Sequence, residues 1–147
     1  MRFKTNFYGD GIIGSTFSPA YANAAYGKNA SDNVLMAFVM GDRAMYLHSL
    51  GDKAIDTLLD ELTEMYGEVV RENYIDFFIQ DWYDNKWVKG AYSYAPVGQM
   101  PDARKKAAQP LADKIFFAGE AMNQNGHHQS VHGAMETGKE AVEKILA

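Results

Sequence analysis

Three histidines stand close together late in the sequence, and their spacing raises the question of a metal site. His128 and His132 are four residues apart, which would place two imidazoles on one face of a helix. No glutamate lies between them, so a third ligand would have to be His127 or the remote Glu120. Small residues around the cluster indicate close approach of something bulky instead: Gly126, Ser130, Gly133 and Ala134. We therefore predict no metal site here, and a histidine metal site is the minor alternative.

A glycine pattern near the start of the chain matches the dinucleotide-binding motif G-x-G-x-x-G at residues 9–14. That function requires a buried strand before the motif and a helix after it. Here the residues before it are polar or charged, and Ser18-Pro19 interrupts the segment where the helix would lie. No acidic residue closes a second strand at the proper distance. We interpret the pattern as a glycine-rich hairpin or bulge.

The stretch from Lys114 to Ala147 predicts the elements that would position the histidines. Ile115 to Ala118 predicts a short buried strand, followed by a Gly119-Glu120 turn, a polar loop and a long amphipathic helix. A strand that ends in glycine near a helix N-terminus is a common way to hold an anionic or electron-rich cofactor. The apolar or small positions of the helix fit one face: Val131, Ala134, Met135, Gly138, Ala141, Val142 and Ile145.

Upstream, the pattern predicts two further strands and one helix. Residues 34–40 form an apolar run typical of a strand buried on both faces, and residues 70–82 predict another strand. Between them we expect a helix capped by Asp52 and ended by Gly67, with its acidic residues on a solvated face. The predicted buried stripe of this helix is Ile55, Leu58, Leu59, Leu62 and Met65.

Aromatic and small residues alternate between Gly90 and Tyr94, where a flat ligand could approach the backbone. The alternative is that Trp82, Trp87 and Tyr92 are half-buried anchors, which such residues commonly are.

Composition excludes several classes of protein. With 147 residues, 47% of them hydrophobic and 22% charged, the chain is expected to fold. The net charge of −5 and the lack of a basic face argue against a nucleic-acid partner. There is no cysteine, no G-x-S-x-G nucleophile motif, no apolar run of membrane-spanning length and no signal-peptide core, so we expect a cytoplasmic protein.

Three sequence blocks carry a family resemblance. They are Trp82-x-Asp84 with Trp87 and Gly90-Ala91-Tyr92-Ser93, then Phe116-Phe117-Ala118-Gly119-Glu120, then Val131-His132-Gly133-Ala134 with Gly138. In order and spacing the chain resembles the C-terminal part of flavin-containing amine oxidases, the family of monoamine oxidases, polyamine oxidases and lysine-specific demethylases. The match is close over residues 82–147 and less distinctive over residues 1–81.

The resemblance implies a set of cofactor-binding residues for FAD. It assigns Gly119 and Glu120 to the ribityl-pyrophosphate portion, and Ser130 and Val131 to a helix start whose amides face the flavin. A positive helix end there would stabilise the negative charge of reduced flavin. The resemblance also places three residues beside the isoalloxazine, with Tyr92 as an aromatic wall that orients a neutral amine for hydride loss: Trp87, Ala91 and Tyr92.

Several positions depart from the family pattern. Ala91 stands where some monoamine oxidases attach the flavin through cysteine, which implies non-covalent FAD. Ser130 stands at the second aromatic-cage position, so the cage is half-built. Lys4 does not match the family's active-site lysine. The family's N-terminal strand-turn-helix for the ADP half of FAD does not occur in these residues.

The sequence therefore predicts a mixed α and β fold, with residues 1–86 as a partial substrate-binding region and residues 87–147 as the C-terminal piece of an FAD-binding domain. The expected function is that of the C-terminal portion of an FAD-dependent amine oxidoreductase, inactive as an isolated chain. Its expected partners are a small amine and the missing N-terminal Rossmann half. The alternative is a non-catalytic interaction module that self-associates or pairs with a flavoprotein half through exposed apolar surface.

Overall fold

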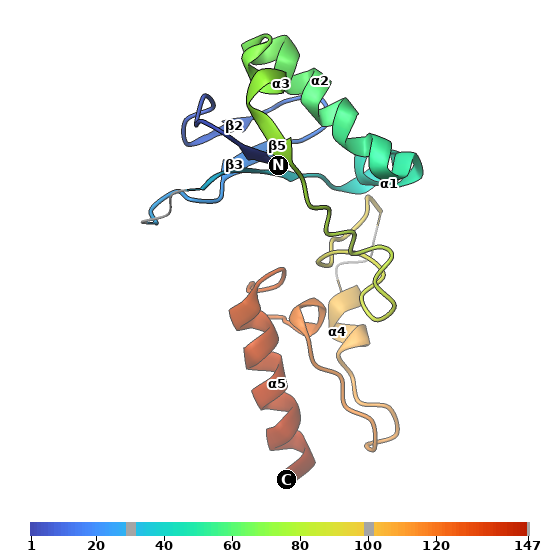
Figure 1. Cartoon of the computed structure of the whole chain (residues 1–147). Coiled ribbons are helices and arrows are strands. Elements are labelled where there is room, and N and C mark those ends of the chain that lie inside the picture. Colours follow the sequence, from blue (N-terminus) through green and yellow to red (C-terminus); the bar gives the residue numbers. More distant parts are fainter. Residues whose placement is uncertain (29–31, 99–101, 147) are drawn as a thin grey trace. The chain divides into compact units, whose positions relative to one another are not determined.

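An antiparallel sheet occupies the first part of the chain, and a long helix dominates the second (Figure 1). The computed structural model describes residues 1–28, 32–98 and 102–146. The chain divides into two units, Met1–Trp82 and Tyr83–Ala147. The assignment of residues 1–86 to a substrate region and 87–147 to an FAD domain stays a prediction.

Short strands pair in the order β2-β3-β4-β1-β5, and every pairing is antiparallel. The glycine pattern at residues 9–14 leads into β2, which forms a hairpin with β3 as predicted. A Cβ on Gly11 would lie 2.6 Å from the carbonyl oxygen of Tyr21, so only glycine allows the two strands to approach this closely. The strands are β1 (Arg2–Phe3), β2 (Gly11–Ile13), β3 (Ala20–Asn23), β4 (Asn33–Phe38) and β5 (Tyr74–Asp76).

Helices cover one face of this sheet and complete its core. They are α1 (Gly41–Leu50), the 3-10 turn η1 (Gly51–Lys53), α2 (Ala54–Tyr66) and α3 (Val69–Asn73). The predicted helix is α2, and it ends at Gly67, whose φ of 78° suits a glycine. The predicted cap was wrong, since Asp52 lies within η1 and α2 begins without a side-chain cap. The buried core joins sheet to helices: Phe3, Tyr8, Tyr21, Leu35, Ile55, Leu59, Leu62 and Val70.

Several details of this unit differ from the sequence prediction. The strand β4 is not buried on both faces, because helices cover only one side of the sheet. Met36 and Phe38 lie on the other side and are exposed. Met65 is likewise exposed, whereas Leu58 packs against the core. The strand predicted over residues 70–82 is confined to β5, because α3 occupies the first residues of that segment. Helix α1 was not predicted.

Glu61 corrects the expectation of a fully solvated acidic face on α2. Only 7% of its surface is exposed, and its carboxylate accepts hydrogen bonds from the Tyr21 hydroxyl (2.5 Å) and the Phe17 amide (2.7 Å). Burial alone would raise the pKa of Glu61, but these bonds, with one from Ser15, outweigh it and lower the pKa below its usual value. The carboxylate therefore joins α2 to the hairpin loop and β3.

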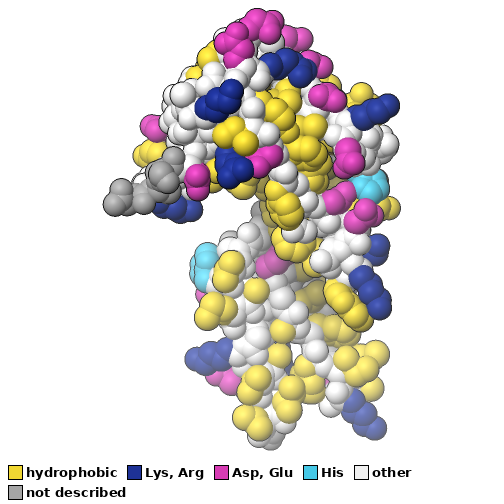
Figure 2. Space-filling view, viewed as in Figure 1, with side chains coloured by type: hydrophobic (Ala, Val, Ile, Leu, Met, Phe, Trp, Pro, Cys, Tyr) yellow, Lys and Arg dark blue, Asp and Glu magenta, His cyan; other side chains and the backbone are white. Residues whose placement is uncertain are grey.

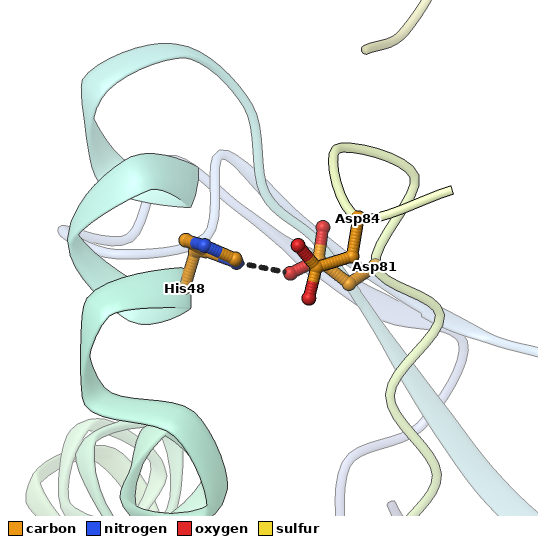
Figure 3. Close-up of side chains that lie close together, drawn as sticks. All are labelled: His48, Asp81 and Asp84. Atoms are coloured by element: carbon orange, nitrogen blue, oxygen red, sulfur yellow. Dashed lines mark hydrogen bonds and ion pairs between the residues drawn. The ribbon is translucent and has the colours of Figure 1, made fainter. Parts of the chain in front are cut away.

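A hydrogen bond joins the end of α1 to the segment after β5. His48 Nδ1 lies 2.5 Å from Asp81 Oδ2 (Figure 3). Asp84, which the same figure labels, belongs to the second unit.

The second unit contains α4 (Ala103–Ala107), the 3-10 turn η2 (Glu120–Met122) and α5 (Val131–Leu146). The long helix is confirmed, but the strand predicted at Ile115–Ala118 is not. A strand needs a neighbouring backbone to pair with, and here Ile115 makes one isolated bridge to Leu111. Phe116, Phe117 and Ala118 belong to no strand.

Polar contacts, rather than an apolar core, hold this unit together. Among its described residues, those classed as buried are Asn123, Gly133 and Thr137. The predicted apolar face of α5 divides in two: Ala134 and Ala141 are partly buried, whereas the larger residues face solvent. Figure 2 shows apolar side chains at the surface of this unit, and those on α5 are Val131, Met135, Val142, Ile145 and Leu146.

Among residues 1–28, 32–98 and 102–146, no helix combines the length and apolar character needed to cross a membrane.

Two buried tyrosines give a matched test of the first unit. Tyr8 is buried, and among the described residues its hydroxyl has no hydrogen-bond partner, whereas the hydroxyl of Tyr21 donates to Glu61. Tyr8→Phe should leave the free energy of unfolding unchanged or raise it by up to about 1 kcal/mol. Tyr21→Phe should lower it by about 1.5–3 kcal/mol, because a buried carboxylate loses a donor. Urea unfolding of both variants measures this, and equal effects would contradict the assignment.

Candidate functional site

Ser130 directly precedes helix α5 and caps its N-terminus. Its hydroxyl accepts a hydrogen bond from the Gly133 amide (3.1 Å) and donates one to the His127 carbonyl (2.5 Å). This is the usual arrangement of an N-cap serine, which bonds the amide three residues on. Ser130 was predicted to contact the cofactor, and the structure commits its hydroxyl to the helix start.

The first amides of α5 are open. Within the part of the chain that the structure describes, the N–H groups of Val131 and His132 have no acceptor, and Val131 is 78% exposed. The first N–H groups of a helix have no partner within the helix, and its dipole places partial positive charge there. The helix start can therefore receive an electron-rich or anionic group.

Asn123 organises the loop that leads to this helix start. Its side-chain oxygen accepts hydrogen bonds from the amides of Asn125 and His127, both at 3.0 Å. Its side-chain nitrogen donates to Glu136 (2.8 Å) and to the carbonyl of Gly133 (3.3 Å). Because Asn123 is 1% exposed and fully bonded, it fixes the loop against the first turns of α5.

Gly133 allows the loop to lie directly on the helix. A Cβ at this position would stand 1.8 Å from the carbonyl oxygen of His127, a distance that no side chain can accommodate. The close approach that the sequence indicated at Gly133 is therefore made by the chain's own loop.

The histidines divide between this loop and the helix. His127 Nδ1 lies 2.9 Å from Glu136 Oε1, and the rings of His127 and His132 are 4.8 Å apart between centroids. The hydrogen bond from His127, followed by that from Asn123, lowers the pKa of Glu136. His127 is thus held by a carboxylate from the second turn of the helix.

Gly119 connects the incoming segment to the middle of α5. Its φ of 139° favours glycine, and its amide donates to the hydroxyl of Thr137 (2.9 Å). Thr137 is buried, and its single hydroxyl hydrogen lies within reach of the carbonyl oxygens of Gly119 (3.0 Å) and Ala134 (3.0 Å). The predicted glycine turn is therefore anchored to the helix by a side chain.

Glu120 joins this turn to the segment that carries the predicted aromatic residues. Its carboxylate accepts hydrogen bonds from the Ser93 amide (2.6 Å), the Ser93 hydroxyl (2.8 Å) and the Gln129 amide (2.7 Å). Burial would raise the pKa of Glu120, but these bonds and the positive charge of Arg104 lower it.

The predicted aromatic residues are not all gathered at this point. Ala91 and Tyr92 precede Ser93, and Tyr92 is partly exposed. Trp87 is 84% exposed, its amide bonds to Asn85, and Lys86 Nζ lies 4.6 Å from its ring centroid. The structure thus ties Ala91 and Tyr92 to the turn through Ser93, whereas these contacts of Trp87 lie within its own loop.

Sequence reasoning missed the polar residues that build the site. They are Ser93, Arg104, Asn123, Gln129 and Thr137. A threonine inside an otherwise apolar helical stripe is a signal that could have indicated Thr137. Arg104 donates hydrogen bonds to the Ser93 hydroxyl (2.7 Å) and to the Ala121 carbonyl (3.1 Å).

Comparison with known proteins decides the family. The model of the family described as "Flavin containing amine oxidoreductase" matches residues 3–146, nearly the whole chain. The chain belongs to the flavin-containing amine oxidoreductase family. The matched residues include the glycine turn and the start of α5.

Similar proteins include demethylases and an amine oxidase. Human "Lysine-specific histone demethylase 2" is 29% identical over 78% of this chain and 14% of its own length. "Lysine-specific histone demethylase 1 homolog 1" of Arabidopsis thaliana is 28% identical over 99% of this chain and 19% of its length. "Peroxisomal N(1)-acetyl-spermine/spermidine oxidase" of Bos taurus is 24% identical over 79% of this chain, which corresponds to 24% of its own length. The chain thus spans less than a quarter of the length of these relatives.

Two helical glycines test whether the loop must lie on α5. Gly133→Ala should strongly reduce the helical signal of α5, because the new Cβ and the His127 carbonyl cannot both keep their places. Gly138→Ala is the matched control, since nothing lies within 4 Å of its Cβ position, and it should stabilise the helix by about 1 kcal/mol. Far-UV circular dichroism measures both, and a gain of helix in Gly133→Ala would contradict the packing.

Proposed function

We propose that this chain supplies the flavin-facing, C-terminal part of an FAD-dependent amine oxidoreductase. Membership of the family over residues 3–146 supports the reaction class. The open amides of Val131 and His132 support the placement of the flavin, because they offer positive partial charge to an electron-rich ring. The fold proposed is a partial substrate region followed by the returning segment and helix of the FAD domain.

The residues of the second unit fit a flavin at the helix start. A bound flavin would supply the hydride acceptor for oxidation of an amine C–N bond. The N–H groups of Val131 and His132 would stabilise the negative charge that this transfer places on the ring. Gly119 would lie along the ribityl-pyrophosphate portion, where its lack of a Cβ leaves room for a ligand. We do not assign the carboxylate of Glu120 as a flavin ligand, since three hydrogen bonds from donors of this chain already engage its two oxygens.

Aromatic side chains would complete the site from the other side. Tyr92 is partly exposed and would orient a neutral amine by stacking, and Trp87 is exposed with the Lys86 ammonium over its ring. Ala91 offers no nucleophile, so the cofactor would be bound without a covalent link. The substrate proposed for the whole protein is a small-molecule amine or an amine-bearing side chain.

A flavin-mononucleotide titration tests this proposal on the chain as it is. In amide NMR spectra, FMN should shift the signals of Val131, His132 and Tyr92 with a weak, millimolar affinity. ADP should shift them much less, because the proposal places the flavin ring rather than the adenine half on this chain. Equal shifts with ADP, or none with FMN, would contradict it.

The isolated chain should not turn over amines. We expect no peroxide release from polyamines or methyl-lysine peptides in the presence of FAD, because the ADP-binding half is missing from these residues. Purification of the chain with one equivalent of yellow flavin would contradict this expectation.

A second candidate function is that of an interaction module that pairs with itself or with a flavoprotein half. The exposed apolar side chains of α5 favour it, since monomeric proteins rarely expose a continuous apolar face. Size-exclusion chromatography should show a species larger than the 16.4 kDa monomer. The variant Met135→Lys/Val142→Lys should restore the monomer, and the control Glu140→Lys should not. A monomeric wild type would contradict this function.

A further inference from the structure

Both oxygens of the Glu120 carboxylate accept hydrogen bonds from protein donors. Oε1 accepts the Ser93 amide at 2.6 Å, and Oε2 accepts the Ser93 hydroxyl at 2.8 Å and the Gln129 amide at 2.7 Å. Charge-assisted bonds this short are the strong ones. Glu120 therefore holds two segments, one that ends in the predicted aromatic wall and one that leads into α5.

Ser93 is held at every polar atom. Its amide and hydroxyl donate to Glu120, its hydroxyl also accepts from Arg104 (2.7 Å), and its carbonyl accepts from the side-chain amide of Gln129 (2.6 Å). Fixing the Ser93 peptide on both sides fixes the backbone that follows Ala91 and Tyr92.

Gln129 is held in a backbone conformation that glutamine rarely adopts. Its φ is 63°, and this left-handed region is unfavourable for a residue that carries a Cβ. The two bonds from its amide and its side chain, to Glu120 and Ser93, offset this cost. They orient the peptide immediately before the Ser130 cap.

We propose that Glu120 is a positioning residue: it holds Ser93 and Gln129 so that Tyr92 and the first amides of α5 face the same ligand, and its own carboxylate does not touch the cofactor. This inference rests on the proposed flavin site, and it departs from the role that the family resemblance implies for Glu120. Arg104 supports the arrangement by placing its charge beside Ser93.

The titration of Glu120 itself provides the test. If both amides bond its carboxylate, the amide proton shifts of Ser93 and Gln129 in the wild-type chain should change together as one group titrates. Because the folded pKa of Glu120 is lowered, that change should fall below the unfolded value of about 4.3. The stabilisation that these hydrogen bonds provide is fully present above the unfolded pKa of Glu120. It is lost as the pH falls through the folded pKa.

Glu120→Gln sharpens the test. In either orientation of the new amide, an NH₂ group faces the N–H of Ser93 or of Gln129, and neither donor can become an acceptor. The shared titration should disappear, and the FMN-induced shifts of Tyr92 and Val131 should weaken at least several-fold. The control Glu140→Gln, on the exposed surface of α5, should leave both readouts unchanged.

The outcomes separate the two proposals. Wild-type amides of Ser93 and Gln129 that do not titrate together would overturn the positioning role, whatever flavin does. If the two amides titrate together but the chain never responds to FMN, Glu120 still holds Ser93 and Gln129, and the proposed flavin site is overturned. Unchanged FMN shifts in Glu120→Gln would show that the hydrogen bonds of Glu120 do not position Tyr92 and the first amides of α5.

Discussion

The second unit depends on polar side chains buried beneath the start of α5. Asn123 bonds the loop before the helix to Gly133 and Glu136, and Thr137 bonds the incoming glycine turn at Gly119. In a unit whose described buried residues include no large apolar side chain, these bonds replace the packing that a core usually provides. They can do so because buried donors and acceptors are costly to leave unpaired, which makes one arrangement of the loop much better than the others.

The first unit is organised differently. Its sheet and helices share an apolar core, and its one buried carboxylate among the described residues, Glu61, is satisfied by donors from the hairpin side. By contrast, α5 leaves its large apolar side chains in solvent while its small ones pack inward. A helix with this division is suited to lie between a loop of its own chain and an apolar surface supplied from elsewhere. This fits a chain that spans less than a quarter of the length of its relatives.

Periodicity predicted the two long helical segments of the chain well, because α2 and α5 each repeat apolar or small residues at helical spacing over several turns. It failed at Ile115–Ala118, since an apolar run fits a strand only if a neighbouring strand is present. It also failed at Glu61, because a residue type that is common on a solvated helix face is buried here by contacts with residues distant in sequence. The block of residues around Gly119 and Val131 identified the family, but pattern alone could not show which polar atoms hold these residues in place.

Amide hydrogen exchange over the whole chain tests most directly whether the second unit is one side of a flavin site without a core of its own. We expect strong protection for the amides of α2 and β4, and weak protection for those of α5 in the chain alone. Saturating FMN should slow exchange in the first turns of α5 and leave α2 unchanged. Protection of α5 equal to that of α2 without any ligand, together with no response to FMN, would refute this view of the second unit.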